Sequence, residues 1–286
     1  MTPSVFLNGK FVPPADAKIS VMDRGFLFGD GIYEVIPVYQ GRAFRLREHL
    51  VRLQQSLAEI RLSVPMTEQE WISLIEELIA RNIHQSPDLA LYLQVTRGAA
   101  KTRDHRFPAD VSPTLFMMAN PLAAQPELAQ IQGIKTITLP DNRWTRCNIK
   151  AICLLPNVLL KEQALDQGGE DVILLRDGQV TESAAANVFI VKDGCAVTPP
   201  KSPLILGGIT RDLVVEMAQQ GSFECREQAI SEQQLRSADE VWLTSSTREI
   251  VPVIEIDGVP VGDGKIGTMW YNVARCFREY KANLAG

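Results

Sequence analysis

Residues 147–155 read CNIKAICLL and place a single lysine, Lys150, directly before an apolar run. A lysine is a poor neighbour for a buried apolar run unless something there uses its amine. Two more stretches follow along the chain, TESAAANVF at residues 181–189 and GGITR at residues 207–211. The glycine pair predicts a helix that begins at about Ile209, where free backbone N–H groups can bind a phosphate.

Together these stretches contain what a protein needs to hold and use pyridoxal phosphate. This cofactor requires a lysine amine for a Schiff base, a partner for its pyridine nitrogen, and donors for its phosphate. Lys150 would supply the amine, and Glu182 would favour a protonated pyridine nitrogen through its charge and its hydrogen bond. Ile209 and Thr210 would donate backbone N–H groups to the phosphate, with the Thr210 hydroxyl as one more donor.

Each motif alone also has an ordinary structural explanation. Lys150 could face water at the end of a strand, since most lysines are surface residues. Glu182 could be a carboxylate in a turn, and GGITR could be a simple helix start. Lys161, the nearest rival to Lys150, lies in a predicted amphipathic helix and is expected to face solvent.

The order and spacing of these motifs closely resemble those of the fold-type IV pyridoxal-phosphate enzymes. The resemblance extends over nearly the whole chain, from FLNG at residues 6–9 to VPV at residues 251–253. This family includes D-amino acid aminotransferases, branched-chain aminotransferases and aminodeoxychorismate lyases. The resemblance implies a two-domain fold of α+β and α/β type, with the cofactor in the cleft between the domains, and a homodimer.

The resemblance also assigns further residues to the cofactor. Arg52, in HLVRL at residues 49–53, resembles the family's phosphate arginine, although helix periodicity alone would place it among solvated residues. Leu206 would pack against the cofactor ring, or it could belong to the core. Hydroxyls and amides for the phosphate could also come from a cluster after a predicted strand, which could equally be a plain strand exit: Ser245, Ser246 and Thr247.

Substrate choice is expected to depend on two places in the first part of the chain. Tyr33 lies in GDGIYEV at residues 29–35, which matches the family's first-domain strand, and Arg103 and His105 lie in a polar loop. In the D-amino acid aminotransferases, such a tyrosine and an Arg-x-His loop bind the substrate α-carboxylate. An arginine suits a carboxylate because it can donate two parallel hydrogen bonds. A polar loop of this kind could also be ordinary surface.

We therefore expect pyridoxal-phosphate-dependent transamination between a D-amino acid and a 2-oxo acid such as 2-oxoglutarate or pyruvate. The alternatives within the family are a branched-chain L-amino acid or (R)-amine aminotransferase and, third, an aminodeoxychorismate lyase. A non-catalytic binding protein on the same scaffold would have no use for Lys150 and Glu182, so it is disfavoured.

Two prolines around small residues, in PLAAQP at residues 121–126, predict a linker. We expect a smaller α+β domain at residues 1–120, a linker at 121–132 and a larger cofactor-binding domain at 133–286. In the first domain, an Asn-Gly turn, a leucine stripe and the capping box Thr67-x-x-Glu70 mark a hairpin and two helices. The expected elements are a hairpin at 6–12, a strand at 31–39, helices at 46–60 and 67–80, and strands at 89–96 and 114–119.

The second domain is predicted to carry many short strands. Three Asp-Gly pairs, at residues 177–178, 193–194 and 257–258, mark turns at strand ends. The expected strands are 135–139, 171–175, 187–191, 240–243 and 251–256. The expected helices are 156–167, 209–220 and 266–281.

Composition narrows the class of protein and of partner. The chain has 286 residues, of which 45% are hydrophobic, and a net charge of −5, which fits a globular protein and weakly disfavours nucleic acid or an anionic membrane as partner. No run approaches the about 18 apolar residues of a membrane span, and no signal peptide is expected.

The three histidines show no metal-ligand spacing, so no metal site is expected. Five cysteines without a Cys-x-x-Cys pair predict buried, reduced thiols in a cytoplasmic protein.

Overall fold

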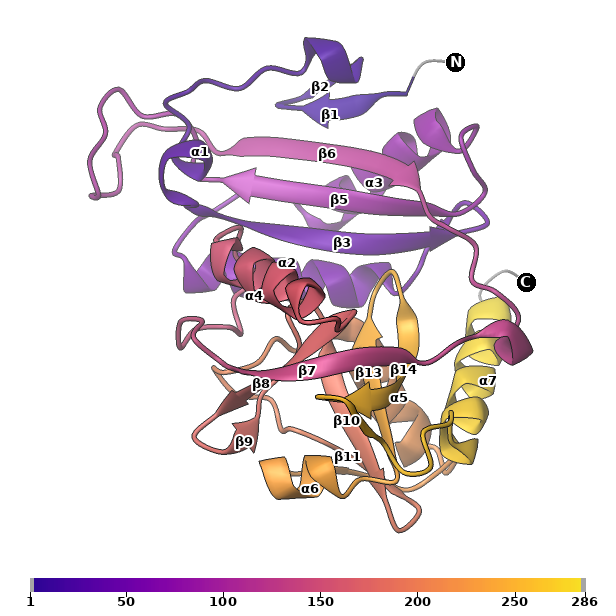
Figure 1. Cartoon of the computed structure of the whole chain (residues 1–286). Helices are drawn as coiled ribbons and strands as arrows, with labels where there is room; N and C mark the ends of the chain where they lie inside the picture. The colour runs from indigo at the N-terminus through magenta and orange to yellow at the C-terminus, as the bar shows by residue number, and fades with distance from the viewer. Residues whose placement is uncertain (1–2, 284–286) are drawn as a thin grey trace. The chain divides into compact units, whose positions relative to one another are not determined.

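The computed structural model describes residues 3–283, which divide into two units (Figure 1). One unit comprises the chain up to Ala124 together with Ile149–Cys153. The other comprises Gln125–Asn148 and the chain from Leu154 onward. The segment around Lys150, which lies in the range assigned to the second domain, therefore packs with the first unit.

The first unit is built on an antiparallel sheet with the strand order β2-β1-β6-β5-β3-β4. Its strands are β1 (Val5–Leu7), β2 (Lys10–Val12), β3 (Gly31–Tyr39), β4 (Arg42–Ala43), β5 (Leu89–Thr96) and β6 (Thr114–Pro121). The β1–β2 turn has positive φ at both Asn8 (47°) and Gly9 (88°), as a two-residue hairpin turn of this type requires. The predicted hairpin and strands are confirmed.

Helices cover this sheet through one apolar stripe each. α2 (Leu46–Glu59) packs against β3, and α3 (Glu68–Asn82) packs against β6. The middle of the predicted stripe of α2, Leu50, Leu53 and Leu57, is buried. The same helix also buries His49, Arg52 and Ser56. The predicted capping box is present at the start of α3, where the Glu70 N–H donates to Thr67 Oγ1 at 3.2 Å and the Thr67 N–H donates to Glu70 Oε2 at 2.6 Å.

The second unit contains a mixed sheet with the order β12-β11-β10-β13-β14-β7-β8-β9, and β15 pairs with β14. Its strands are β7 (Ile134–Pro140), β8 (Asp171–Arg176), β9 (Gln179–Val180), β10 (Asn187–Lys192), β11 (Cys195–Thr198), β12 (Cys225–Glu227), β13 (Glu240–Ser245), β14 (Glu249–Ile256) and β15 (Val259–Pro260). The pairs β14–β7, β7–β8 and β11–β12 are parallel. All three predicted Asp-Gly turns have positive φ at both residues.

Four helices and a short turn complete the described part of the second unit: α4 (Leu155–Asp166), α5 (Ile209–Gln219), α6 (Glu232–Arg236), α7 (Thr268–Asn283) and the 3-10 turn η2 (Leu128–Gln130). The three predicted helices are confirmed to within two residues at each end. The missed elements, such as α6, β9, β12 and β15, have 2 to 5 residues. They are too short to show a periodic pattern. The predicted linker also holds the last residue of β6 and η2.

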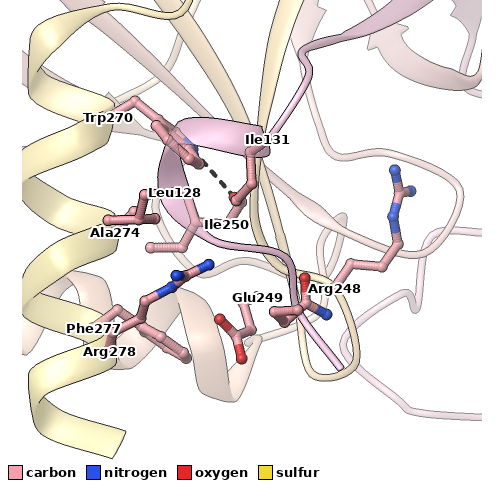
Figure 2. A pocket seen from close by; sticks show the side chains of 10 residues that line it. Leu128, Ile131, Arg248, Glu249, Ile250, Trp270, Ala274, Phe277 and Arg278 are labelled. Atoms are coloured by element: carbon pink, nitrogen blue, oxygen red, sulfur yellow. Dashed lines mark hydrogen bonds between the residues drawn. The ribbon is translucent and has the colours of Figure 1, made fainter. Parts of the chain in front are cut away.

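A small pocket lies in the second unit where η2, the start of β14 and α7 meet (Figure 2). Trp270 Nε1 donates to the Ile250 carbonyl at 3.1 Å across it, and Phe277 adds an apolar wall. Its lining includes none of the residues predicted for the cofactor or substrate. No helix within residues 3–283 has the length and apolar content that crossing a membrane requires.

Candidate functional site

Lys150 is held by its backbone at one end of β3. The Tyr33 N–H donates to the Lys150 carbonyl at 2.9 Å, and the Lys150 N–H donates to Ser56 Oγ of α2 at 3.2 Å. The half-buried side chain places its Nζ 4.1 Å from the centroid of the Tyr33 ring. Two predicted site residues, Lys150 and Tyr33, are therefore in contact, and the amine rests against an aromatic face.

The apolar run that follows Lys150, residues 151–155, was expected to be buried, but part of it is exposed. Cys153 is exposed and Leu155 is 68% exposed, because the chain leaves the first unit here and enters α4. All five cysteines are free, but only Cys147 and Cys195 are buried, so the prediction of buried thiols is wrong for the exposed Cys153 and for the half-buried Cys225 and Cys276. Lys161, the alternative candidate for the Schiff-base lysine, has its amine bound within the protein. Its Nζ donates to the Glu170 carbonyl and lies 3.3 Å from Asp171 Oδ2.

Arg52 is buried, with 7% of its surface exposed, so periodicity alone placed it wrongly among solvated residues. It donates from Nε to Glu34 Oε1 at 2.8 Å and from Nη2 to Glu34 Oε2 at 2.7 Å. His49 Nδ1 lies 2.8 Å from Glu34 Oε2. Glu34 follows Tyr33 on β3, and strand alternation turns it toward the core under α2, opposite to Tyr33. Glu34 and His49 were not predicted as site residues, although Glu34 directly follows Tyr33 and His49 lies in the HLVRL motif of Arg52.

The electrostatics of this cluster follow from its burial. Burial alone would raise the pKa of Glu34, but the Arg52 guanidinium and the His49 hydrogen bond outweigh it and hold that pKa far below its usual range. Burial lowers the pKa of His49, and Glu34 only partly opposes this. We therefore assign His49 as neutral near pH 7, with Nδ1–H donating to Glu34.

Arg103 and His105 are exposed in the loop between β5 and β6, and both contact Phe28 at the end of α1 (Arg24–Phe28). The Arg103 guanidinium carbon is 4.7 Å from the Phe28 ring centroid, and the His105 ring centroid is 5.2 Å from it. Tyr33 instead stacks on Tyr92 at 5.6 Å. The structure thus brings Arg103 together with His105, and Tyr33 together with Lys150, but no hydrogen bond or ring contact joins these two pairs.

Glu182, in the second unit, is 5% exposed and is held from both carboxylate oxygens. Its Oε1 accepts from Arg143 Nη1 at 2.5 Å, and its Oε2 accepts from the Leu206 N–H at 3.0 Å and from Asn187 Nδ2 at 3.3 Å. Arg143 also donates from Nε and Nη2 to Asp141, at 2.9 Å each. Arg143 and Asp141 were not predicted as site residues, because nothing in their local sequence pattern distinguishes them from surface residues.

Burial raises the pKa of Glu182, while Arg143 and the Leu206 amide oppose that rise. Burial also works against the charge of Arg143, but Asp141 and Glu182 outweigh it and raise the Arg143 pKa, so this guanidinium stays protonated. The site thus holds a carboxylate beside a permanent cation. Such a carboxylate has its negative charge compensated from one side, and a cationic partner could approach its other edge.

The glycine pair leads directly into α5, whose N-cap is Gly208. A Cβ on Gly208 would lie 2.0 Å from Asn187 Oδ1, so only glycine fits there. Asn187 in turn donates to the Leu206 carbonyl at 2.8 Å, which ties the loop before the helix to the residues around Glu182. Ile209 and Thr210 are buried in the first turn of α5, so the predicted helix start is confirmed, and their binding of a phosphate stays a prediction.

The three hydroxyl residues lie where β13 ends. Ser245 is the last residue of β13 and pairs with Glu249 of β14, so Ser246 and Thr247 form the turn between these strands. All three are half-buried. Arg248, in the turn with Ser246 and Thr247, pairs with Asp171 at 2.7 Å. α5 packs against β13, the strand that leads into this turn.

Among the described residues, no cluster of His, Cys, Asp and Glu could hold a metal ion.

Residues 31–256 match the family model of the Amino-transferase class IV proteins. The chain is 40% identical over 269 residues to a D-alanine aminotransferase of Bacillus licheniformis, covering 94% of each chain. It is also 40% identical to a D-alanine aminotransferase of Staphylococcus epidermidis, covering 96% of this chain and 97% of that protein.

Solved structures of similar fold include the branched-chain amino acid aminotransferase of Escherichia coli, with a TM-score of 0.88 and 29% identity, covering 98% of this chain and 94% of that one. A second is a branched-chain amino acid aminotransferase of T.th. with pyridoxamine 5'-phosphate, with a TM-score of 0.89 and 27% identity over 98% of this chain and 94% of that one.

Proposed function

Because this chain belongs to the class IV aminotransferases, we propose that it transfers the amino group of a D-amino acid to a 2-oxo acid with pyridoxal phosphate as its cofactor. The observation that carries the proposal is the 40% identity, over almost the full length, to proteins named D-alanine aminotransferase. The solved branched-chain enzymes are less similar, at 27–29% identity.

The donor set around Glu182 supports the choice of cofactor. A buried carboxylate with a fixed cation on one side suits a ring nitrogen that carries a proton. The glycine at position 208 keeps the helix start close to Asn187, and the N–H groups of Ile209 and Thr210 suit a phosphate. Arg52, Leu206, Ser245, Ser246 and Thr247 would complete the cofactor contacts. One solved relative was crystallised with pyridoxamine 5'-phosphate, which is the amino form of the same cofactor.

When bound, pyridoxal phosphate supplies a carbonyl carbon for the amino group and an electron-accepting ring. Lys150 would then move a proton between the substrate Cα and the carbonyl carbon that the cofactor supplies, with its amine beside the Tyr33 ring. Glu182 would hold a proton at the pyridine nitrogen. Arg143 and the Leu206 N–H fix the Glu182 carboxylate so that it does not have to reorganise during the reaction.

We further propose that Arg103, His105 and Tyr33 bind the substrate carboxylate. Arg103 and His105 are exposed and close together on Phe28, so they can present a cation and an imidazole to one anionic group. The side of the cofactor on which this group is held determines which Cα hydrogen faces Lys150, and therefore which enantiomer reacts.

We also propose a cytoplasmic homodimer. Five free cysteines are typical of a reducing compartment. α4 exposes apolar side chains on one face, with Leu155, Val158 and Leu159 each more than half exposed and Leu165 49% exposed. A second copy of the chain could cover such a stripe. Sedimentation analysis should give twice the monomer mass, and a monomer at micromolar concentration would refute the dimer.

A panel of paired D- and L-amino acids with 2-oxoglutarate tests the proposed function. We expect turnover of D-alanine and D-glutamate and little turnover of their L-enantiomers. The second candidate is a branched-chain L-amino acid aminotransferase, which the names of the solved neighbours favour. A clear preference for L-leucine or L-valine would overturn the D-specific proposal in its favour.

A further inference from the structure

We propose that Arg24, Phe28 and Asp30 form a clamp that holds the loop of Arg103 and His105 ready for the substrate carboxylate. We define the carboxylate loop as residues 98–112. The proposal deepens the proposed function and rests on its assignment of Arg103 and His105. None of the three clamp residues contacts the carboxylate in this scheme, so they are positioning residues.

The centre of the clamp is the Arg24 guanidinium, which is buried, with 4% of the residue exposed. Its Nη1 donates to the Asp104 carbonyl at 2.5 Å, and its Nη2 donates to the His105 carbonyl at 3.4 Å. Its Nε donates to Asp30 Oδ2 at 2.7 Å. The rigid Arg24 guanidinium therefore connects Asp30, the residue before β3, to the carbonyls of the two residues that follow Arg103 in the loop.

The position of Arg24 is itself well determined. It is the first residue of α1, whose N-cap Asp23 accepts from the Gly25 N–H at 2.8 Å and from Thr114 Oγ1 at 2.6 Å. The Arg24 N–H donates to the Gly98 carbonyl at 2.9 Å, at the start of the carboxylate loop. The backbone and the side chain of Arg24 thus hold two different parts of the same loop.

Asp30 joins this clamp to a second arginine. Arg97 donates from Nε to Asp30 Oδ2 at 2.9 Å and from Nη2 to Asp30 Oδ1 at 3.0 Å. The guanidinium carbon of Arg97 also lies 3.7 Å from the ring centroid of Phe107, a second residue of the carboxylate loop. The two cations compensate for the burial of Asp30 and keep its pKa below the usual range. The carboxylate at the root of the clamp therefore stays charged.

Phe28 connects the clamp to the proposed binding residues. Its ring centroid lies 4.8 Å from the guanidinium carbon of Arg24 and 4.7 Å from that of Arg103, and the His105 ring is 5.2 Å away. An exposed arginine that rests on an aromatic ring samples fewer orientations than one that extends into water. Less freedom is then lost when a carboxylate binds, so the clamp is expected to act on substrate affinity.

The first test is the variant Phe28→Leu, which removes the ring and leaves the Arg24 hydrogen bonds. We expect KM for D-alanine and for the 2-oxo acid to rise about 5- to 20-fold, with kcat changed less than about threefold, because Arg103 and His105 each lose a ring contact of modest strength. Phe28→Tyr keeps the ring and should restore the KM values. The matched control is Phe11→Leu, which removes a ring that lies 4.3 Å from the Arg81 guanidinium and should leave KM unchanged.

The second test measures the loop without any substrate. Lys101, Arg103 and Arg106 are exposed, so trypsin can cut the loop once it moves away from the clamp. Phe28→Leu should be cut faster at 101–106 than the wild type, and Phe11→Leu should not. Phe107→Leu changes a residue that is 47% exposed, so it should fold, and it should also be cut faster.

Unchanged cleavage in Phe28→Leu and Phe107→Leu, together with an unchanged KM in Phe28→Leu, would overturn the clamp. A parallel fall in kcat, KM and the visible cofactor band would overturn it as well, since that pattern indicates general damage. The cleavage test does not depend on the substrate. If the enzyme prefers L-amino acids, the proposed function fails in the donor panel while the clamp can still be judged by trypsin.

Discussion

At the scale of single residues, both principal chemical groups are held largely by residues outside their own motifs, with Asn187 as the exception. Lys150 is placed by Tyr33 and Ser56, and Glu182 is placed by Arg143, Asn187 and the Leu206 amide. The contacts of Glu182 fix its carboxylate, and those of Lys150 fix its backbone while its amine lies beside the Tyr33 ring. Fixed positions of this kind favour proton transfer and charge stabilisation.

Lys150→Ala should abolish transamination, because the reaction then has no amine to carry the Cα proton. Borohydride should fix the cofactor to the wild type but not to this variant. The matched control is Lys161→Ala, which removes from α4 an amine that pairs with Asp171, and it should keep near wild-type turnover. Substantial turnover by Lys150→Ala would contradict the whole assignment.

Glu182→Gln should fold and bind much of the cofactor, but it should lower kcat. A neutral amide no longer favours a proton on the pyridine nitrogen by its charge, and the expected increase in the barrier is about 2–4 kcal/mol. Steady-state kinetics with D-alanine measures the effect. If kcat stays within a few-fold of the wild type, Glu182 does not have this role.

Arg103→Leu should raise KM for D-alanine and D-glutamate about ten- to hundredfold, because a charge-assisted pair with the carboxylate is lost. Cofactor binding should not change, since Arg103 is assigned to the substrate. Titration of the variant with D-alanine, followed at the visible cofactor band, separates the two effects. A weakened cofactor band with normal KM would assign Arg103 to the cofactor instead.

At the scale of elements, the start of α5 depends on one close approach. The neighbouring glycines differ sharply: a Cβ on Gly208 would lie 2.0 Å from Asn187 Oδ1, whereas the nearest atom to a Cβ on Gly207 would be a flexible Lys201 carbon at 3.7 Å. The strand β10, the loop before α5 and the helix start are thus locked together at Asn187.

Gly208→Ala should displace Asn187 and weaken the cofactor site, and Gly207→Ala should be nearly neutral. We expect cofactor affinity to fall at least about tenfold only in the first variant, because the Leu206 loop and the helix start lose their common anchor. Cofactor titration followed by absorbance compares them. Equal affinities in the two variants would show that the close approach at Gly208 does not control the site.

The elements also show why the strands and helices were predictable and part of the site was not. Asn8-Gly9, the three Asp-Gly turns, the capping box of α3 and the stripe of α2 all depend on residues within about four positions of one another. The burial of Arg52 was not predictable in this way. α2 has no local pattern that separates a polar residue facing water from one facing Glu34 on β3.

At the scale of the whole molecule, each unit has an apolar core of its own. Ile32, Leu53 and Trp71 belong to the first core, and Ile173, Val188 and Val241 belong to the second. The first unit also buries the ionic cluster of Glu34, His49 and Arg52, so its stability should depend on pH.

The folded chain should lose stability as the pH falls. The pKa of His49 is lowered by folding, so the unfolded chain binds a proton first, and this contribution declines below about pH 6.5. The pKa of Glu34 is lowered as well, so its contribution is present above about pH 4.3 and declines below that value. Thermal unfolding at about pH 7.5, 5.5 and 3.5 samples both ranges. His49→Gln should flatten the change between the two higher pH values, and an unaltered slope would contradict the role of His49.

The sequence by itself determined the element types and turns, the family, and the identity of Lys150 and Glu182 as candidates. These depend on local patterns or on motif order along the chain. Only the tertiary structure decided which residues that are distant in the sequence contact one another in and around the site. Arg143 and Glu182 are 39 positions apart, Arg52 and Glu34 are 18 apart, and Arg24 and Asp104 are 80 apart. Such pairs form because buried charges need partners, and the folded path of the chain determines which partners are within reach.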